Sequence, residues 1–253
     1  MKPLFFLSAL LFIFSLPACN KDDNNNPNGI KLLDYYTEEL YPNTTSFTYN
    51  SDNQIIKTED NEETNTLVIN GNQLHYTEYR KSESRTTADA TFTLNAAGNI
   101  ASGHGNFEYA LGSPFSADFT FTYDNAGNLT KRTDVRSDGM TNSYELGWTN
   151  GDNTSVRWIY HDSLYLTITT SYDLSKPDKL KIGSNYFLMQ MNSFVGNHNQ
   201  HLPNHSFTVF APGTTKVQQY DFSFSLDGDG YPVTQNINNL DGIYSDVYHY
   251  HYK

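Results

Sequence analysis

Five histidines in the C-terminal part of the chain are the residues best suited to bind a metal ion. They are His198, His201, His205, His249 and His251. Three fall in one loop, and the other two lie two apart on a predicted strand, where their side chains share a face. Two strand histidines and one loop histidine would form a tetrahedral zinc site with an open position. No sequence feature brings the groups together, so solvated or hydrogen-bonded histidines are the favoured interpretation.

A second cation candidate is the segment DGDGY, in which Asp227 and Asp229 alternate with glycines. A calcium loop needs six to eight oxygen ligands. The spacing of an EF-hand and its distal glutamate are missing, so a hairpin turn is favoured over Ca²⁺ binding. The sequence predicts no cofactor, with Ca²⁺ and Zn²⁺ as the alternatives.

No catalytic residue is assigned. The sequence has no GxSxG, HExxH, phosphate-loop or dinucleotide motif. The adjacent His161, Asp162 and Ser163 cannot form a triad by themselves, because neighbouring strand residues point to opposite faces. Two carboxylates from distant strands could still form a catalytic pair, so the sequence leaves open whether the protein is an enzyme.

The two tryptophans are candidates for ligand binding. Trp148 and Trp158 lie in predicted strands, and their rings have the flat faces that stack on sugars. Tryptophans in alternating strands more often belong to the core or the rim, and that is the competing interpretation.

Short alternating segments must position these residues. They are rich in Thr, Tyr, Phe, Ile and Val, and Asn, Asp, Gly and Ser separate them, which is typical of an antiparallel β meander. The predicted strands are Ser46–Asn50, Thr64–Asn70, Gln73–Lys81, Ala90–Asn95, Asn106–Ala110, Asp118–Asp124, Thr130–Arg136, Thr141–Thr149, Ser155–His161, Leu164–Asp173, Ser206–Phe210, Lys216–Asp227, Val233–Ile237 and Tyr244–Tyr252. We expect the meander to curl into a barrel or half-barrel. One short helix is predicted over Ser184–Val195, followed by an irregular loop at 196–205, in which Pro203 disfavours a central strand.

One turn sequence recurs. Residues 119–134 read FTFTYDNAGNLTKRTD, in which Asp124 accepts backbone N–H groups and Gly127 takes a positive φ. LNAAGNI at 94–100, YNSDNQI at 49–55 and LDGDGYP at 226–232 repeat it. Their irregular spacing argues against a solenoid and for hairpins that share one turn chemistry.

The N-terminus is typical of a signal peptide, because Lys2 precedes an apolar run from Leu4 to Leu16 that is too short to span a membrane comfortably. We expect residues 1–18 to be removed, residues 19–30 to form a flexible tether, and residues 31–253 to form a single β domain. LPAC at 16–19 resembles the lipobox of bacterial lipoproteins, which implies that Cys19 is lipidated, for example with palmitate, and becomes the first residue. An ordinary signal peptide with an incidental cysteine is the alternative.

Charge argues against a nucleic-acid binder, and cysteine content excludes a fold held by internal disulfides. After cleavage the chain keeps 15 of its 16 basic residues and all 28 acidic residues, a formal charge of −13. Nucleic-acid binders carry a basic stripe, so no nucleic-acid partner is expected. The single cysteine excludes an internal disulfide, and the 37 aromatic residues must supply the core.

Three resemblances concern location and fold. CNKDD at 19–23 resembles the export signal of Bacteroidota-type lipoproteins, which implies an outer-membrane protein facing the cell exterior, with a periplasm-facing one as the alternative. YDNAGNL, GWTNGDN at 147–153, VGNHNQHLPNH at 195–205 and SLDGDGYP at 225–232 resemble lipoproteins bearing a porin-like domain of unknown function. The YDNAGNL turn also resembles the YD repeat, although its copies here are few and far apart.

The resulting functional hypothesis is a surface lipoprotein that binds a partner or serves a structural role without catalysis. A glycan-binding accessory protein and a metal-dependent hydrolase are the alternatives, and a glycan or a surface protein is the expected partner beside the membrane. A barrel that spans the membrane would need an apolar outward band, whereas Asp, Asn and Gly occur throughout this chain. A filled interior would favour a scaffold, and an open one would favour ligand binding.

Overall fold

The structure, a computed structural model, describes residues 30–40, 42–108, 114–180, 193–210, 217–242 and 245–253. The chain divides into Met1–Lys31 and Leu32–Lys253, and of the first unit only Ile30 and Lys31 are described. No helix in the described ranges is long and apolar enough to cross a membrane. The predicted signal peptide, Cys19 and the tether lie outside the described residues.

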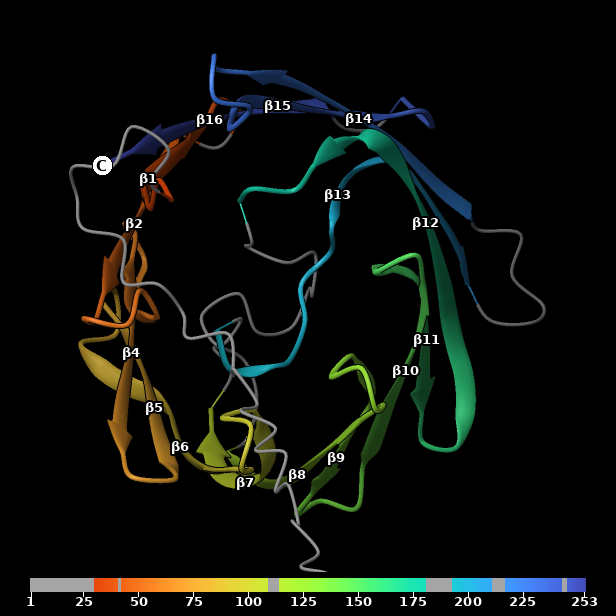
Figure 1. Cartoon of the computed structure of the whole chain (residues 1–253). Coiled ribbons are helices and arrows are strands. Elements are labelled where there is room, and N and C mark those ends of the chain that lie inside the picture. The colour runs from red at the N-terminus through yellow and green to blue at the C-terminus, as the bar shows by residue number, and fades with distance from the viewer. Residues whose placement is uncertain (1–29, 41, 109–113, 181–192, 211–216, 243–244) are drawn as a thin grey trace, which may run out of the picture. The chain divides into compact units, whose positions relative to one another are not determined.

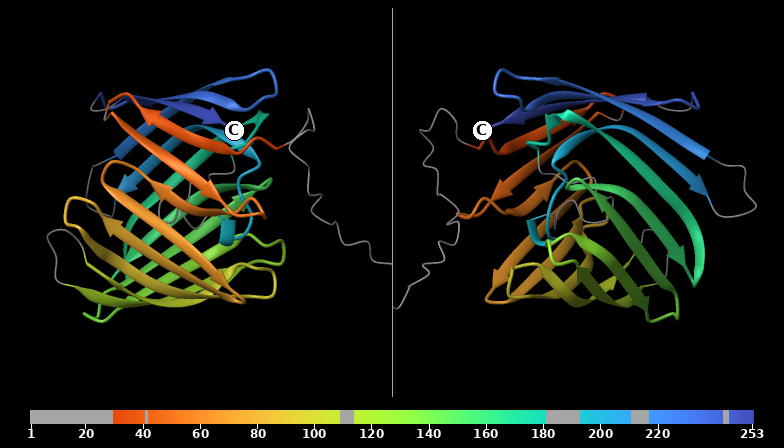
Figure 2. Two further views of the ribbon diagram at one scale, coloured as in Figure 1. Left: turned by 90° about the vertical axis from the view of Figure 1, so that its left-hand side faces the viewer. Right: turned by 45° about the vertical axis from the view of Figure 1, so that its right-hand side comes forward.

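The second unit is a closed antiparallel barrel of sixteen strands, seen along its axis in Figure 1 and from the side in Figure 2. The strands are β1 (Leu33–Glu38), β2 (Asn43–Tyr49), β3 (Ile55–Glu59), β4 (Glu63–Asn70), β5 (Gln73–Arg80), β6 (Arg85–Leu94), β7 (Ile100–Phe107), β8 (Phe115–Tyr123), β9 (Leu129–Arg136), β10 (Thr141–Thr149), β11 (Asp152–Tyr160), β12 (Ser163–Pro177), β13 (His201–Phe210), β14 (Val217–Leu226), β15 (Pro232–Asn239) and β16 (Ser245–Tyr252). Each strand pairs with its neighbours in sequence, and β1 pairs with β16 to close the barrel. The predicted antiparallel β barrel is therefore confirmed.

Period-two alternation decides which side chains enter the barrel. In β8, Phe119 and Phe121 are buried, whereas Thr120 and Thr122 between them are exposed. In β16, Tyr248, Tyr250 and Tyr252 pack on the buried cluster around Leu33, as expected for an inward face. The aromatic residues thus point inward and the short polar residues point to the solvent.

The two ends of the barrel differ. One end carries the β2–β3, β4–β5, β6–β7, β8–β9, β10–β11 and β14–β15 turns, and the long β12–β13 connection starts and finishes there. We call residues 193–200 of that connection the strap, and this end the strap end. In Figure 1 the strap, drawn in cyan, runs inside the ring of strands.

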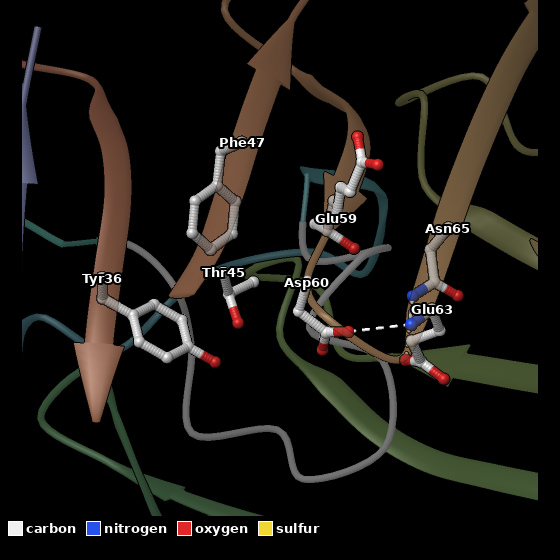
Figure 3. Close-up of a pocket in the computed structure, with 8 residues that line it drawn as sticks. Tyr36, Thr45, Phe47, Glu59, Asp60, Glu63 and Asn65 are labelled. Carbon is white, nitrogen blue, oxygen red and sulfur yellow. Dashed lines mark hydrogen bonds between the residues drawn. The ribbon is translucent and has the colours of Figure 1, made fainter. Parts of the chain in front are cut away.

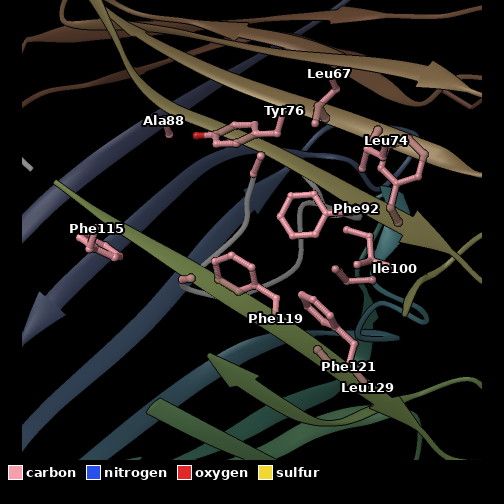
Figure 4. Close-up of a cluster of buried hydrophobic side chains, with 14 residues drawn as sticks. Leu67, Leu74, Tyr76, Ala88, Phe92, Ile100, Phe115, Phe119, Phe121 and Leu129 are labelled. Carbon is pink, nitrogen blue, oxygen red and sulfur yellow. The ribbon is translucent and has the colours of Figure 1, made fainter. Parts of the chain in front are cut away.

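The larger buried cluster includes two side chains of the strap. Phe194 is 1% exposed and Val195 is 2% exposed, and they pack with inward residues of β4 to β9, among them Phe92 and Leu129. Figure 4 shows the strand residues of this cluster. Burying a side chain such as Phe194 contributes about 1.5–3 kcal/mol, so the strap is part of the core.

Two strands were not predicted, and one was misplaced. β1 and β3 have no clear alternation, since LDYYTE has two adjacent tyrosines and IIKTE has two adjacent isoleucines. β7 runs from Ile100 to Phe107, whereas a strand was predicted over Asn106–Ala110. The glycines in IASGHGNF hid it, because glycine is depleted in strands. The predicted helix at 184–195 lies largely outside the described residues, which contain no α-helix.

The predicted irregular loop at 196–205 is confirmed for residues 196–200 and wrong for the rest, because β13 begins at His201. Pro203 pairs with Tyr172 of β12 beside a register shift, whereas the pairing of β13 with β14 begins only at His205. At Pro203, β13 is therefore paired with β12 but not yet with β14. The N–H that proline lacks is not needed for pairing with β14 at this position.

Candidate functional site

The four related turns share one hydrogen-bonding scheme. Asp124 Oδ1 accepts the N–H groups of Ala126 and Asn128, both at 2.9 Å, and Gly127 has a φ of +87°. The bonds from Asn128 and Ala126 lower the pKa of the Asp124 carboxyl. The first residues of the other three turns, Asn50, Asn95 and Asp227, each accept two N–H groups in the same way. The predicted turn chemistry is confirmed.

Strap residues are held against these turns. The Asn197 N–H donates to the Gly127 carbonyl at 3.1 Å, and its side-chain amide donates to the Ala126 carbonyl at 2.7 Å. The Ile55 N–H donates to the Ser193 hydroxyl at 3.3 Å. The strap therefore bridges the β2–β3 and β8–β9 turns. The buried cluster that Phe194 and Val195 join lies on β4 to β9, on the side of the barrel between these two turns.

Asp152, at the start of β11, anchors the C-terminal part of the strap. Its side chain is 1% exposed, and one carboxylate oxygen accepts the N–H groups of Gln200 and His201 at 2.8 and 2.9 Å. The other oxygen lies 2.8 Å from His201 Nδ1. The Asn153 N–H also donates to Asn199 Oδ1 at 2.7 Å. GWTNGDN and VGNHNQH, two segments on which the family resemblance rests, are thus direct neighbours.

The histidine candidates are distributed over separate parts of the barrel. His198 belongs to the strap, and His201 is bonded to Asp152. His205 lies 2.7 Å from Asp221 of the neighbouring strand. His249 lies 2.7 Å from Glu39, and the ring of His251 stacks on Tyr35 with centroids 4.3 Å apart. The structure does not bring the loop histidines and the β16 histidines together, since β14 and β15 separate β13 from β16.

The aspartates of the DGDGY segment form a turn. Asp227 Oδ1 accepts the N–H groups of Asp229 and Tyr231, and the Asp229 carbonyl accepts Lys179 Nζ. Across the described ranges, no three His, Cys, Asp or Glu side chains are grouped so as to hold a metal ion.

The two tryptophans occupy different environments inside the barrel. The Trp148 indole N–H donates to the Leu129 carbonyl at 2.8 Å, near the strap end. The Trp158 indole N–H donates to Asn142 Oδ1 at 3.1 Å, and its ring lies 5.6 Å from that of the buried Tyr144. Trp158 is thus placed near the opposite end of β10 and β11.

Trp158 belongs to a group of rings on β10–β13 that we call the aromatic wall. Its members are Tyr144, Trp158, Tyr160, Tyr165 and Phe210. The Tyr165 ring lies 4.7 Å from Trp158, 6.4 Å from Tyr160 and 6.2 Å from Phe210. These rings form one contiguous surface across four strands.

A β-bulge places Tyr165 in this wall. Trp158 pairs with Leu166 while Ile159 pairs with Leu164, so Tyr165 is the extra residue of β12. Such a bulge redirects a side chain. The Tyr165 ring contacts the inward residues Trp158 and Phe210. The side chains of Tyr160 and Tyr165 are nevertheless 36% and 42% exposed. Solvent therefore reaches the inner face of this wall.

The outer face of the barrel is largely polar. In β8 the outward side chains are Ser116, Asp118, Thr120 and Thr122. Ion pairs and histidine–carboxylate pairs cross between outward residues of neighbouring strands, as in Arg157–Glu145 and His104–Asp118. Exposed apolar side chains such as Val68, Val135 and Val209 are scattered on different strands.

A closed sixteen-stranded antiparallel barrel with inward aromatic residues defines the structural class of this protein as porin-like in architecture. Two solved structures are similar. A porin-like protein from Bacteroides uniformis aligns with a TM-score of 0.63 and 14% sequence identity, over 87% of this chain and 98% of that one. A porin-like protein from Bacteroides vulgatus aligns with a TM-score of 0.62 and 16% identity, over 88% of this chain and 99% of that one.

No protein-family model matches the sequence, and no curated protein matches it either. At these identities the two structures establish the shared fold alone. The resemblance to porin-like proteins is confirmed at that level, whereas the resemblances to lipoproteins and YD-repeat proteins stay predictions.

Proposed function

We propose that this protein is a non-catalytic binding module of the cell envelope, and that the aromatic wall is its ligand-contacting surface. The observation that carries the proposal is the exposure of Tyr160 and Tyr165, 36% and 42%, on side chains directed into the barrel. Inward rings in the packed part of the barrel are buried, as Phe92 is at 1%, whereas Tyr160 and Tyr165 lie beside the β11–β12 turn at the opposite rim. The strap end therefore serves as the packed base of the barrel, and the aromatic wall as the accessible part.

A glycan is the ligand that this surface fits best. Flat aromatic faces bind the apolar faces of sugar rings, while tyrosine hydroxyls and the Asn142 amide supply hydrogen bonds to hydroxyl groups. The His161 ring lies 6.5 Å from that of Tyr160, and the Asp134 carboxylate near Tyr144 is paired with Arg132. The five rings of the wall themselves carry no acid–base group, so the surface favours binding over acid–base catalysis.

The outer face supports a barrel surrounded by water. A membrane-spanning barrel presents an apolar band about 25 Å tall to lipid. The outward residues of β8 include Asp118 and two threonines, and the outward Glu145 and Arg157 pair across β10 and β11. Charged groups at these central strand positions would be costly in lipid, so we propose that the membrane is reached through a lipid on Cys19. This anchor and its outward orientation rest on the sequence.

The aromatic wall is tested by glycan binding to a Cys19→Ser variant, which removes the proposed lipid but leaves the barrel unchanged. A panel of neutral and acidic oligosaccharides is titrated while the intrinsic fluorescence of Trp158 and Trp148 is recorded. Replacing Tyr165 by Ala is expected to weaken binding about tenfold, or about 1.4 kcal/mol. The same change at Tyr79, which is also 42% exposed but points outward on β5, provides the matched control.

Equal binding by the Tyr165 and Tyr79 variants would remove the aromatic wall as the ligand surface. A complete absence of binding across the panel would leave a scaffold as the better description.

A further inference from the structure

A second inward-facing feature lies between β1 and β4, and it has a different chemical character. It is a cavity of about 110 Å³ lined by Tyr36, Thr45, Phe47, Thr58, Glu59, Asp60, Glu63 and Asn65. Figure 3 shows Tyr36 and Phe47 on one side of it and Asp60, Glu63 and Asn65 on the other. The cavity thus combines two aromatic rings with carboxylates and is separate from the aromatic wall of β10–β13.

Two carboxyl groups of this cavity are satisfied by neutral donors. Asp60 Oδ1 accepts the N–H groups of Glu62 and Glu63 at 2.7 and 2.8 Å. Glu63 Oε1 accepts the side-chain amide of Asn65 at 3.0 Å. Among the described residues, no lysine or arginine lies within ion-pair distance of the Asp60 or Glu63 carboxylate. Glu59, which also lines the cavity, is paired with Lys57 and Lys81, and Lys81 Nζ donates to the Asp60 carbonyl at 2.6 Å.

The surrounding charges increase the negative potential in the cavity. Burial raises the pKa of Glu63 and the charges of Glu78 and Asp60 add to that rise, whereas the hydrogen bond from Asn65 and the charge of Arg80 oppose it. Burial likewise raises the pKa of Glu38, with further contributions from Asp246 and Asp60. The nearby guanidinium of Arg80 is bound by Glu78 and Glu83. Negative groups therefore converge on this part of the interior, and a cation would relieve their mutual repulsion.

We propose that this cavity binds a compact organic cation, such as an alkylammonium or quaternary ammonium group. Tyr36 and Phe47 place aromatic rings on one side of the cavity for a cation–π contact, and Asp60 and Glu63 place negative charge on the opposite side. An engineered apolar cavity of about 150 Å³ holds benzene, so about 110 Å³ suits a group of about five heavy atoms.

The chemistry of the lining favours an organic cation over a metal ion or a sugar. The described residues provide no group of three metal ligands, and two of the lining residues are aromatic rings that contribute no oxygen ligands from their faces. A sugar ring is larger than the available volume. This inference goes beyond the proposed glycan surface and does not depend on it.

The test compares two probes of nearly equal size and shape, tetramethylammonium chloride and neutral tert-butanol. Saturation-transfer NMR on the full chain measures the binding of each at constant ionic strength. We expect tetramethylammonium to bind in the millimolar range and tert-butanol to bind at least about tenfold more weakly. Equal binding of the two probes, or no binding of tetramethylammonium, would overturn the proposal.

A pair of variants locates the site. Glu63→Gln removes one cavity charge and keeps an amide that bonds Asn65, so tetramethylammonium binding should weaken about fivefold or more. Glu145→Gln removes the same net charge from the outer face, where Glu145 is paired with Arg157, and should leave binding unchanged.

Equal weakening in the two variants would indicate a nonspecific charge effect and would contradict the site. If Glu63→Gln disturbs the fold, Phe47→Leu replaces it, because it removes an aromatic face while keeping a side chain of similar size. Loss of tetramethylammonium binding in that variant supports the site, and unchanged binding opposes it.

Discussion

Gly196 provides the sharpest test of how the strap is held. Its φ is +89°, and a Cβ placed there would lie 2.4 Å from the Gly127 carbonyl oxygen and 2.9 Å from the Tyr123 ring. Gly98, in the related β6–β7 turn, has a φ of +80°, but a Cβ there meets no atom within 4 Å. Replacement by Ala thus imposes the left-handed strain at both positions and a steric clash only at Gly196.

The difference between the two variants measures the contact between strap and turn. The left-handed conformation costs about 1–2 kcal/mol for an alanine. Overpacking adds about 1–3 kcal/mol, so we expect a loss of about 1–2 kcal/mol for Gly98→Ala and about 2–5 kcal/mol for Gly196→Ala. The free energy of unfolding is measured by urea denaturation of both variants beside the wild type. A Gly196→Ala loss no larger than that of Gly98→Ala would refute a strap clamped against the β8–β9 turn.

Four further predictions concern charges and the anchor. Asp152→Asn should lower the free energy of unfolding, measured by urea denaturation, by about 2–4 kcal/mol, because it removes a buried charge that accepts three hydrogen bonds. The control Asp221→Asn removes an exposed partner of a histidine and should lower the free energy of unfolding by about 0–1 kcal/mol. Glu38→Gln should raise Tm at pH 7. Burial raises the pKa of Glu38 above its unfolded value of 4.5, so ionisation of this carboxyl opposes folding. The gain in Tm should disappear as the pH falls below about 4.5, where the carboxyl is protonated in both states. Glu59→Gln should have the opposite sign at pH 7, since Lys57 and Lys81 lower the pKa of Glu59 to about 2, and its loss should fade as the pH falls from 4.5 towards 2. Cys19→Ser should move the protein from the membrane fraction to the soluble fraction, and an unchanged membrane fraction would contradict the lipid anchor.

Local sequence predicted much of the barrel wall. In β8 the alternation of Phe119 and Phe121 with threonines specified both the strand and its inward face. β10 was predicted with the bounds that it has, Thr141–Thr149. Closure of the barrel was not determined by such signals, since it joins Tyr36 to Tyr250 across most of the chain. Local periodicity carries no information on a pairing at that separation, and so a half-barrel remained an alternative.

The candidate site was harder to predict from the sequence than the barrel wall, because tertiary structure brings its residues together. Trp158 was a candidate from its type, but Tyr165 was not, because period two alone would not place it beside Trp158. The bulge opposite Ile159 redirects it, and no single residue marks that bulge in the sequence. The acidic cavity was missed for a related reason. Tyr36 and Glu63 lie on β1 and β4, and only the barrel brings their inward faces together.

The recurrent turn has a physical role that links the sequence motif to the strap. Its first side chain accepts the turn's own N–H groups, as Asp124 does for Ala126 and Asn128. Carbonyl groups at the tip are then free to accept donors from elsewhere. The strap uses them, since Asn197 donates to the Ala126 and Gly127 carbonyls. Because every buried backbone group requires a partner, a turn that satisfies its own donors presents an acceptor surface to the segment that packs on it. The motif therefore forms a hairpin at Gly98, where an added Cβ meets no atom of the described residues within 4 Å, and becomes a docking surface at Gly127, where the strap crosses it.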